Sequence, residues 1–428
     1  MRELRESLTR RLTTNSFYRF VLSYSTFVVI LFSAFVQILF IGKYLDNSII
    51  SPYAPTAMDA LDYTSRAEIW RSRGFSEAFT DVSRMPGYPF LIYINNLLFS
   101  EYTYLATRCF QLLTLAVSVG LIKIVLQKYT SQAIAVFTSG LFAFLPIWHF
   151  IPILIGETLT AVIIIALIYL LSKIHNREIS LKYIFMISMC IAIETYLKPN
   201  NILIIIPIIG FLIFSKQSKV LRTTARILFF VLILLLPWIG FASSAQKGFL
   251  GLTANSGINA YIGTGMIINY DGGILAKSAI KWKVDPKSNA SDIVAGIDKE
   301  SPIIRNNLYA QKSIQIWKNR FWAELGFGFD KIRFAFGLNS ESKLESIFGI
   351  FNILGLLSAL LLLKDRALRS WGIALLLIAM TLSIQAIIFQ ADRRFVIPVF
   401  SPFAIVCLGI VFHAILRGIS SRTAPNSE

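Results

Sequence analysis

Residues 202–214 have the sequence ILIIIPIIGFLIF, in which no side chain is charged or polar. Apolar runs of similar character recur along most of the chain. As a helix, about 20 apolar residues cross the ~30 Å hydrocarbon core of a bilayer. A membrane β-barrel would instead consist of segments of about 10 residues in which apolar and polar side chains alternate. The sequence therefore predicts an all-α polytopic membrane protein and excludes a barrel.

The composition supports this class. Of the 428 residues, 55% are hydrophobic and 15% are charged, whereas soluble domains have about 25% charged residues. The net charge is +17, but the basic residues concentrate in the short connections between apolar runs. Such a distribution is the one that membrane insertion requires, so nucleic-acid binding is not predicted.

The short apolar segment 86–99 determines the predicted topology. At about 14 residues it is too short for a span and is typical of an interfacial helix. If it does not span, every short basic connection lies on the cytoplasmic side, as the positive-inside rule requires. We then expect about ten transmembrane helices, at roughly 21–41, 103–122, 131–148, 152–172, 182–197, 200–215, 226–244, 344–363, 371–390 and 395–416.

This topology places both termini in the cytoplasm, because the basic N-terminus precedes the first span. Two long segments, 43–102 and 246–342, are external. Within the second, residues 305–336 mix aromatic and basic side chains as amphipathic helices at the headgroup level do. The chain therefore divides into an N-terminal transmembrane module (1–245), a long external loop (246–342) and C-terminal helices with a cytoplasmic tail (343–428).

Ionisable residues near membrane depth are costly and are functional candidates. On this topology the carboxylates and cations gather at the outer face, which predicts a site that holds an anionic group and removes a proton. The members are Asp59, Asp62, His149, Glu157, Glu194, Lys198, Asp392, Arg393 and Arg394.

Each of these residues also has a purely structural interpretation. Glu157 at a helix start complements the helix dipole, Lys198 could extend its ammonium group to lipid headgroups, and the paired arginines could anchor to the same groups. His149 fits an interfacial aromatic position better than a ligand position. The cysteines Cys109, Cys190 and Cys407 have no metal-type spacing. The sequence requires no metal ion, and whether a divalent cation assists is left open.

An ordered set of motifs resembles the GT-C glycosyltransferases that use polyprenyl-phosphate sugars, including the protein O-mannosyltransferases and the lipid A aminoarabinose transferase. Lys198 stands where these families usually have Arg, and Phe395 where they have Tyr. No globular domain follows the last span, which leaves acceptor recognition mainly to 246–342. The motifs are Asp59-x-x-x-Tyr63-x-x-x-Ala67, Arg84-x-Pro86-Gly87-Tyr88-Pro89, Arg108, Glu157-Thr158-Leu159, Lys198-Pro199, Asn255-Ser256-Gly257-Ile258-Asn259 with Ile262-Gly263, and Asp392-Arg393-Arg394-Phe395 with Pro398 and Pro402.

The resemblance implies an inverting enzyme that transfers a sugar from a polyprenyl-phosphate donor to an acceptor hydroxyl on a cell-envelope glycan, lipid or protein. It implies the bacterial inner (plasma) membrane, with an archaeal origin left open, and a periplasmic or extracellular active site. Asp59 is expected to be the catalytic base, with Lys198, Arg393 and Arg394 as ligands of the donor phosphate. Residues expected to bind the acceptor or organise the site are Asp62, Tyr63, Arg84, Tyr88, Glu157 and His149.

Two other functions remain open at this stage. An O-antigen-type polymerase or ligase would also act on lipid-linked sugars, but its external loops would be rich in arginine, and the external carboxylates would have no clear role. A transporter or flippase of lipid-linked sugars would have two related halves with helices broken near the midplane. No such repeat is visible in the sequence.

Overall fold

The computed structural model describes residues 24–44, 58–80, 82–175, 179–215, 219–264, 266–269, 281–284, 301–338, 343–389 and 393–422. Two features of the sequence prediction lie outside these ranges: the basic residues of the N-terminus, which precede Tyr24, and the single residue Asp392. The described chain is almost entirely helical, which confirms the predicted fold class. Its main helices are α3 (Ser25–Tyr44), α4 (Met58–Arg73), α5 (Gly87–Phe99), α6 (Thr103–Leu126), α7 (Gln132–Phe142), α8 (Glu157–Ile174), α9 (Leu181–Leu197), α10 (Ile205–Phe214), α11 (Val220–Ala245), α12 (Ser256–Gly263), α14 (Pro302–Ala335), α15 (Lys343–Leu362), α16 (Arg369–Ile388) and α17 (Arg393–Arg422).

Each of the ten predicted spans has a helical counterpart. Seven segments of the described chain are long and apolar enough to cross a membrane, and two shorter apolar helices occupy Pro199–Phe214 and Ser346–Leu362. The tenth counterpart is α9, with 17 residues. Large apolar side chains on the outer faces of these helices, including Leu31, Phe35, Leu113, Phe229 and Leu232, are exposed, as expected of surfaces that meet lipid tails.

The predicted span at 152–172 begins later than expected. Pro146 opens the short 3-10 helix η3 (Pro146–Phe150), and α8 begins only at Glu157. Leu154 between them has a positive φ of 51°, a conformation that non-glycine residues rarely adopt. The chain thus makes a tight turn immediately before Glu157.

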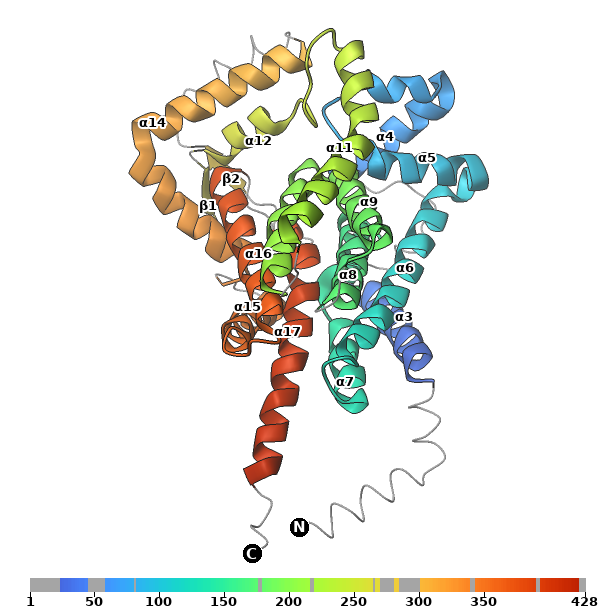
Figure 1. The fold of residues 1–428 in the computed structure, drawn as a ribbon. Helices are drawn as coiled ribbons and strands as arrows, with labels where there is room; N and C mark the ends of the chain where they lie inside the picture. Colours follow the sequence, from blue (N-terminus) through green and yellow to red (C-terminus); the bar gives the residue numbers. More distant parts are fainter. Residues whose placement is uncertain are drawn as a thin grey trace, which may run out of the picture.

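The short apolar segment 86–99 forms a helix that is not aligned with the helices of the bundle. Helix α5 has 13 residues and lies across one end of the molecule beside α4, whereas α6 runs along the bundle (Figure 1). Two further short 3-10 helices follow them in the chain: η1 (Phe75–Phe79) after α4 and η2 (Ser100–Tyr102) after α5. The predicted interfacial position of 86–99 agrees with this arrangement.

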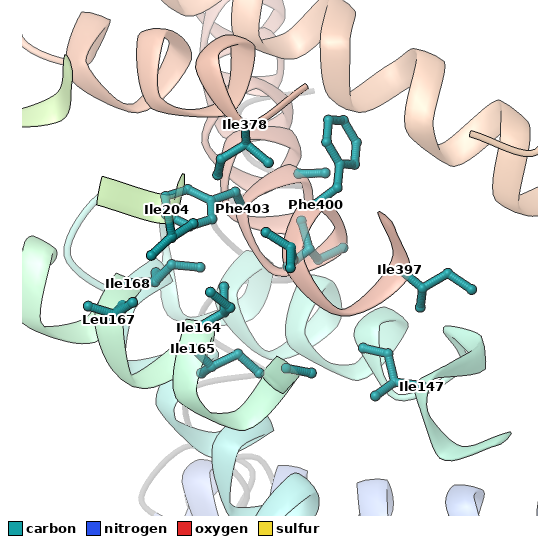
Figure 2. Packing of buried hydrophobic residues seen from close by; sticks show 14 of the residues in the cluster. Ile147, Ile164, Ile165, Leu167, Ile168, Ile204, Ile378, Ile397, Phe400 and Phe403 are labelled. Atoms are coloured by element: carbon teal, nitrogen blue, oxygen red, sulfur yellow. The ribbon is translucent and has the colours of Figure 1, made fainter. Parts of the chain in front are cut away.

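The core of the bundle forms where α8 and α17 pack together with α10 and α16. Isoleucines 164 and 168 of α8 gather with Ile378 of α16 and Phe403 of α17 (Figure 2). Ile204, the last residue of the 3-10 helix η4 (Pro199–Ile204), joins this cluster. This packing holds helix α8 in place, and it thereby sets the position of Glu157, the first residue of the helix.

Helices α12 and α14, which lie between α11 and α15 in the chain, are found at the same end of the molecule as α4 and α5 (Figure 1). Helix α14 confirms the predicted helix at 305–336 and bends at Arg320, where φ is −135°. Strands β1 (Met266–Asn269) and β2 (Lys281–Val284) pair antiparallel, with Met266 opposite Val284. This ribbon and helix α12 were not predicted from the sequence.

Candidate active site

A cavity of about 260 Å³ lies at the end of the bundle that α12 and α14 cover. It is large enough to admit a small polar ligand. Charged side chains enter it from α4, the segment before α5, the start of α8, the end of α9 and the start of α17. These five residues are Asp59, Arg84, Glu157, Lys198 and Arg394.

Asp59 stands between two arginines. Its Oδ1 accepts a hydrogen bond of 2.6 Å from Nη2 of Arg84, and its Oδ2 accepts one from Nη1 of Arg394. Burial raises the pKa of Asp59, but the positive charges of Arg394 and Arg84 outweigh burial, and the net pKa lies below 3.8. The carboxylate is therefore ionised at neutral pH, as a proton acceptor must be.

Asp62 lies behind this pair and does not line the cavity. Its Oδ2 accepts a 2.9 Å hydrogen bond from Nε of Arg84, and its Oδ1 accepts one of 2.9 Å from Nε of Arg66. Charges therefore alternate from Arg66 through Asp62, Arg84 and Asp59 to Arg394. Asp62 positions Arg84, which agrees with its expected role as an organising residue.

Tyr63 also lines the cavity, one turn after Asp59 on α4. The guanidinium carbon of Arg84 lies 5.8 Å from the centre of its ring, within the range of a cation–π contact. Burial raises the pKa of Tyr63, so its phenol remains a hydrogen-bond donor over the physiological pH range.

Glu157 and Lys198 form the second charged pair of the cavity. Nζ of Lys198 lies 2.6 Å from Oε1 of Glu157, whose side chain is 2% exposed. Nε of Arg394 lies 3.9 Å from the same oxygen. Removing one partner of such a buried pair costs about 3–5 kcal/mol, so Glu157 and Lys198 hold each other in place.

The break after α9 brings Lys198 to the cavity. A residue before proline is restricted to extended backbone, and Lys198 has φ −146° and ψ 119°. Gly87 fits against the same region, because a Cβ atom there would lie 2.6 Å from the carbonyl oxygen of Tyr196. This close approach holds the Arg84 segment beside Lys198.

Buried polar side chains of α6 hold the turn before Glu157. Nε of Arg108 donates to the carbonyl oxygen of Pro152 at 3.1 Å, and Nε2 of Gln111 donates to that of Ile155 at 3.0 Å. Gln111 also donates to the hydroxyl oxygen of Tyr88 at 3.0 Å. Tyr88 is fully buried and does not line the cavity, so it supports Glu157 from behind.

Arg393 and Arg394 open α17, where the helix dipole disfavours positive charge. Such a local conflict is typical of functional sites. Only Arg394 of the two lines the cavity. Nε of Arg393 donates to the carbonyl oxygen of Phe334 at 3.1 Å, and its guanidinium lies 4.5 Å from the centre of that ring. The structure therefore does not bring Arg393 to the predicted phosphate site, because consecutive helical side chains point in different directions.

His149 does not reach the cavity either. It is buried in η3, with Trp148 and Phe150 as ring neighbours. His149 is absent from the residues that line the cavity, so no contact supports a role in binding the acceptor, and its expected part in organising the site stays a prediction. Within the described residues, no three His, Cys, Asp or Glu side chains form a group that could hold a metal ion.

The uncharged polar side chains of the cavity were not predicted from the sequence. Asn255 and Asn259 belong to one of the family-like motifs, which assigns them no role, and Gln385 belongs to none of these motifs. A glutamine within an apolar helix is a signal that could have been used. The amides that line the cavity are Asn200, Asn201, Asn255, Asn259 and Gln385.

A comparison with protein families matches residues 83–241 to the family described as dolichyl-phosphate-mannose-protein mannosyltransferase. A search of curated proteins by sequence finds no match. Among solved structures, the oligosaccharyltransferase of Archaeoglobus fulgidus in its apo form superposes with a TM-score of 0.51, at 13% identity over 95% of this chain. The same enzyme with an inhibitory peptide and a dolichol phosphate gives 0.50, at 11% identity over 95% of this chain.

This chain covers 53% of the archaeal oligosaccharyltransferase and thus spans about half of its length. ArnT from Cupriavidus metallidurans, bound to undecaprenyl phosphate, superposes with a TM-score of 0.42 at 12% identity, over 92% of this chain and 79% of that one. The fold is that of the GT-C membrane glycosyltransferases, and the resemblance expected from the motifs is confirmed at this level.

Proposed function

We propose that this protein is a membrane glycosyltransferase that moves a sugar from a polyprenyl monophosphate to the hydroxyl group of an acceptor. The observation that carries the proposal is a cavity in which both oxygens of Asp59 are paired with arginines. The description of the matched family names dolichyl-phosphate-mannose, a lipid-linked sugar phosphate. The archaeal oligosaccharyltransferase binds a dolichol phosphate. Both support a lipid-linked phosphate donor.

The donor phosphate is assigned to Arg394 and Lys198, with Arg84 nearby. A guanidinium can bind two phosphate oxygens at once, and an ammonium group binds as a point charge. In the free protein these cations are paired with Asp59 and Glu157. Donor binding therefore exchanges carboxylate partners for phosphate oxygens, and it removes part of the positive charge that holds the pKa of Asp59 low.

Asp59 is assigned as the base. The acceptor hydroxyl gives its proton to a carboxylate oxygen of Asp59 while the acceptor oxygen bonds to the anomeric carbon of the sugar. The bond between that carbon and the phosphate oxygen breaks, and its electron pair leaves with the polyprenyl phosphate. A single displacement of this kind inverts the anomeric configuration. Release of the phosphate is favoured by fixed cations in a site from which water is largely excluded.

The charge balance of the cavity favours a monophosphate. Three cations and two carboxylates line it, which leaves one positive charge in excess. A sugar phosphodiester carries one negative charge, which this excess balances. The phosphate monoester that leaves carries up to two, and Asp59 takes up a proton in the same step, which leaves the cavity with two positive charges in excess. A pyrophosphate carrier would bring more negative charge than the described side chains of the cavity balance.

The proposed orientation places the cavity outside the cell. The beginning of α3, the loop between α15 and α16 and the end of α17 lie at the opposite end of the bundle from α12 (Figure 1). In a cysteine-free background, an impermeant thiol reagent added to intact cells should label a cysteine at Ser72, which is exposed beside the cavity end. It should not label one at Arg366, which is exposed in the α15–α16 loop. The opposite pattern would invert the orientation.

The direct test of function uses the purified full chain in lipid nanodiscs with polyprenyl-phosphate sugars and candidate acceptors. We expect acceptor-dependent release of polyprenyl phosphate and a glycosylated acceptor with inverted configuration. If the protein binds the donor without releasing polyprenyl phosphate, and moves the donor across the membrane when it is reconstituted into sealed vesicles, the transporter alternative would be supported. Absence of both binding and release for all donors would overturn the proposal.

A further inference from the structure

The ring of Phe395 lies beside the two cations that are assigned to the donor phosphate. Phe395 is the third residue of α17, is half-buried, and lines the cavity. Nζ of Lys198 lies 4.6 Å from the centre of its ring, and Cζ of Arg394 lies 5.3 Å from the same centre. Both distances are within the range of about 6 Å for a cation–π contact. The two phosphate cations therefore share one aromatic ring.

The contact between Phe395 and Lys198 joins two distant segments of the chain. Arg394 precedes Phe395, and adjacency alone accounts for their contact. Lys198 comes from the break between α9 and η4, so only tertiary structure brings it to the ring. The same two cations also share a carboxylate oxygen, because Oε1 of Glu157 lies 2.6 Å from Nζ of Lys198 and 3.9 Å from Nε of Arg394. Cations gathered around one oxygen repel each other, and an aromatic face that attracts both offsets part of this repulsion.

The ring attracts the cations in a different way from the carboxylates. Glu157 and Asp59 accept hydrogen bonds from the ammonium and guanidinium groups, so they occupy N–H groups that a phosphate would need. A phenyl ring attracts a cation through the negative charge of its face. It carries no formal charge that would repel a phosphate. Phe395 can therefore hold both cations while their N–H groups bind a ligand.

This contact should contribute more when phosphate is bound than when the cavity is free. In the free protein each cation is already held by a carboxylate, Lys198 by Glu157 and Arg394 by Asp59. In the proposed exchange, phosphate oxygens replace these carboxylates. Lysine and arginine side chains have much rotamer entropy to lose when they are fixed. Phe395 is the neighbour of both cations that the ligand does not need to displace.

We propose that Phe395 is a positioning residue that holds Lys198 and Arg394 together as the phosphate-binding pair through cation–π contacts with both. The inference rests on the proposed function, and it names a residue that determines affinity for the lipid phosphate. An uncharged side chain without hydrogen-bonding groups would then set the strength of an ionic site.

A series of fluorinated phenylalanines at position 395 tests the contact in the full-length protein. Fluorine draws electron density away from the face of the ring and weakens cation–π attraction, with little change in the shape of the side chain. Phenylalanines with one, two and three fluorines are incorporated in turn. We expect Kd for polyprenyl monophosphate, titrated in nanodiscs, to rise with each fluorine, on the order of tenfold over the series. A Kd that stays constant along the series would overturn the inference.

Phe334 provides the matched control. Its ring centre lies 4.5 Å from Cζ of Arg393, and neither residue lines the cavity. The same series at Phe334 weakens a cation–π contact away from the phosphate site, so Kd for polyprenyl monophosphate should stay nearly unchanged. An equal rise of Kd in both series would contradict the assignment to Phe395.

Two ordinary substitutions give a second readout. Phe395→Tyr keeps an aromatic face, whereas Phe395→Leu keeps apolar bulk without one. We expect the Leu variant to bind polyprenyl monophosphate about tenfold more weakly than the Tyr variant. Equal affinity of the two folded variants would contradict the inference.

Sugar transfer by the wild-type protein separates this inference from the proposed function. If the wild type transfers sugar but Kd stays constant along the fluorine series, the inference fails and the proposed function stands. If Kd follows the series but no polyprenyl-phosphate sugar is consumed, the proposed function fails and the phosphate-binding pair stands. Absence of any binding of polyprenyl monophosphate would refute both.

Discussion

The two ends of helix α8 both carry buried polar side chains, but the two groups are built differently. At the first residue, Glu157 pairs with Lys198 at 2.6 Å, and both line the cavity. Just after the last residue, Nδ1 of His175 lies 3.3 Å from the hydroxyl of Tyr129, and Nε2 lies 3.1 Å from that of Ser370. The His175 group consists of neutral hydrogen bonds and does not line the cavity.

The helix dipole is satisfied at both ends, since Glu157 is in the first turn and Nζ of Lys128 donates to the carbonyl oxygen of Ser172 near the last. A favourable interaction with the helix dipole therefore does not distinguish the functional group at Glu157 from the structural group at His175. The two groups differ in whether a ligand can replace one of the interacting partners. In an ion pair beside the cavity, an anionic ligand can replace the carboxylate partner of the cation. The hydrogen bonds of His175 are buried among packed aromatic rings, and they hold helices together.

The largest effect is expected for Asp59→Asn at the cavity end. The amide keeps the shape of the side chain but cannot accept a proton at neutral pH, so turnover should fall about 10²–10⁴-fold while donor binding survives. Asp62→Asn is the matched control, because Asp62 lies behind Arg84 and outside the cavity. It should lose less than about tenfold, since its contact is indirect. Full activity of Asp59→Asn in a single-turnover assay would remove Asp59 as the base.

Arg394→Ala should weaken binding of a polyprenyl-phosphate sugar by roughly 10–100-fold, because hydrogen bonds to charged groups contribute about 1.5–3 kcal/mol. Arg393→Ala is the neighbouring control. Its side chain packs on Phe334, so we expect a lower free energy of unfolding with donor affinity nearly unchanged. Equal loss of donor affinity in both variants, measured by titration in nanodiscs, would show that the two arginines act together at the headgroups.

The sequence predicted the spans and the charged half of the cavity for a physical reason. Apolar length reports burial in a membrane, and charges at membrane depth are retained only where they are used, as with Asp59, Glu157 and Lys198. It could not tell Arg394 from Arg393, because which of two neighbours faces the cavity depends on the rotation of α17 against α14. The asparagines that line the cavity were not predicted, because asparagines at helix starts are common capping residues.

Helix α12 is a part of the fold that could not be predicted from the sequence, again because it depends on a tertiary contact. Its Gly- and Asn-rich stretch is typical of a loop, and local propensity disfavours a helix there. The helix forms because Gly257 allows its backbone to contact Asn306 of α14. Such a tertiary contact between distant segments leaves no periodic pattern in the sequence. The predicted α14 differs, because its aromatic and basic residues recur at helical spacing.

The pH dependence of turnover tests the proposed exchange of partners around Asp59. In the free protein Arg394 and Arg84 keep the pKa of Asp59 below 3.8. Since the base acts when deprotonated, the acid limb of kcat/KM, which reports the free enzyme, should lie below pH 3.8. A bound phosphate draws Arg394 away and adds a negative charge, so the limb of kcat, which reports the complex, should lie at higher pH than the limb of kcat/KM. Coincident limbs would contradict the exchange of partners, and a thermal scan at each pH checks that the protein stays folded.

The smallest effect on turnover is expected at the other end of α8. Ser370→Ala removes the hydrogen bond to Nε2 of His175 and leaves that buried nitrogen without its partner, so the free energy of unfolding should fall by about 1–3 kcal/mol. Turnover per folded molecule should stay within about twofold, because the group does not touch the cavity. Thermal unfolding and donor turnover, measured on one preparation, separate the two readouts.

Burial lowers the pKa of His175 below 6.5 in the folded protein. Because the unfolded chain then binds the proton more readily, stability should hold above pH 6.5 and fall as the pH drops below it. His175→Gln should flatten this part of the stability profile and leave turnover intact. If either variant abolished turnover while the protein stayed folded, the division of α8 into a reactive end and a supporting end would be wrong.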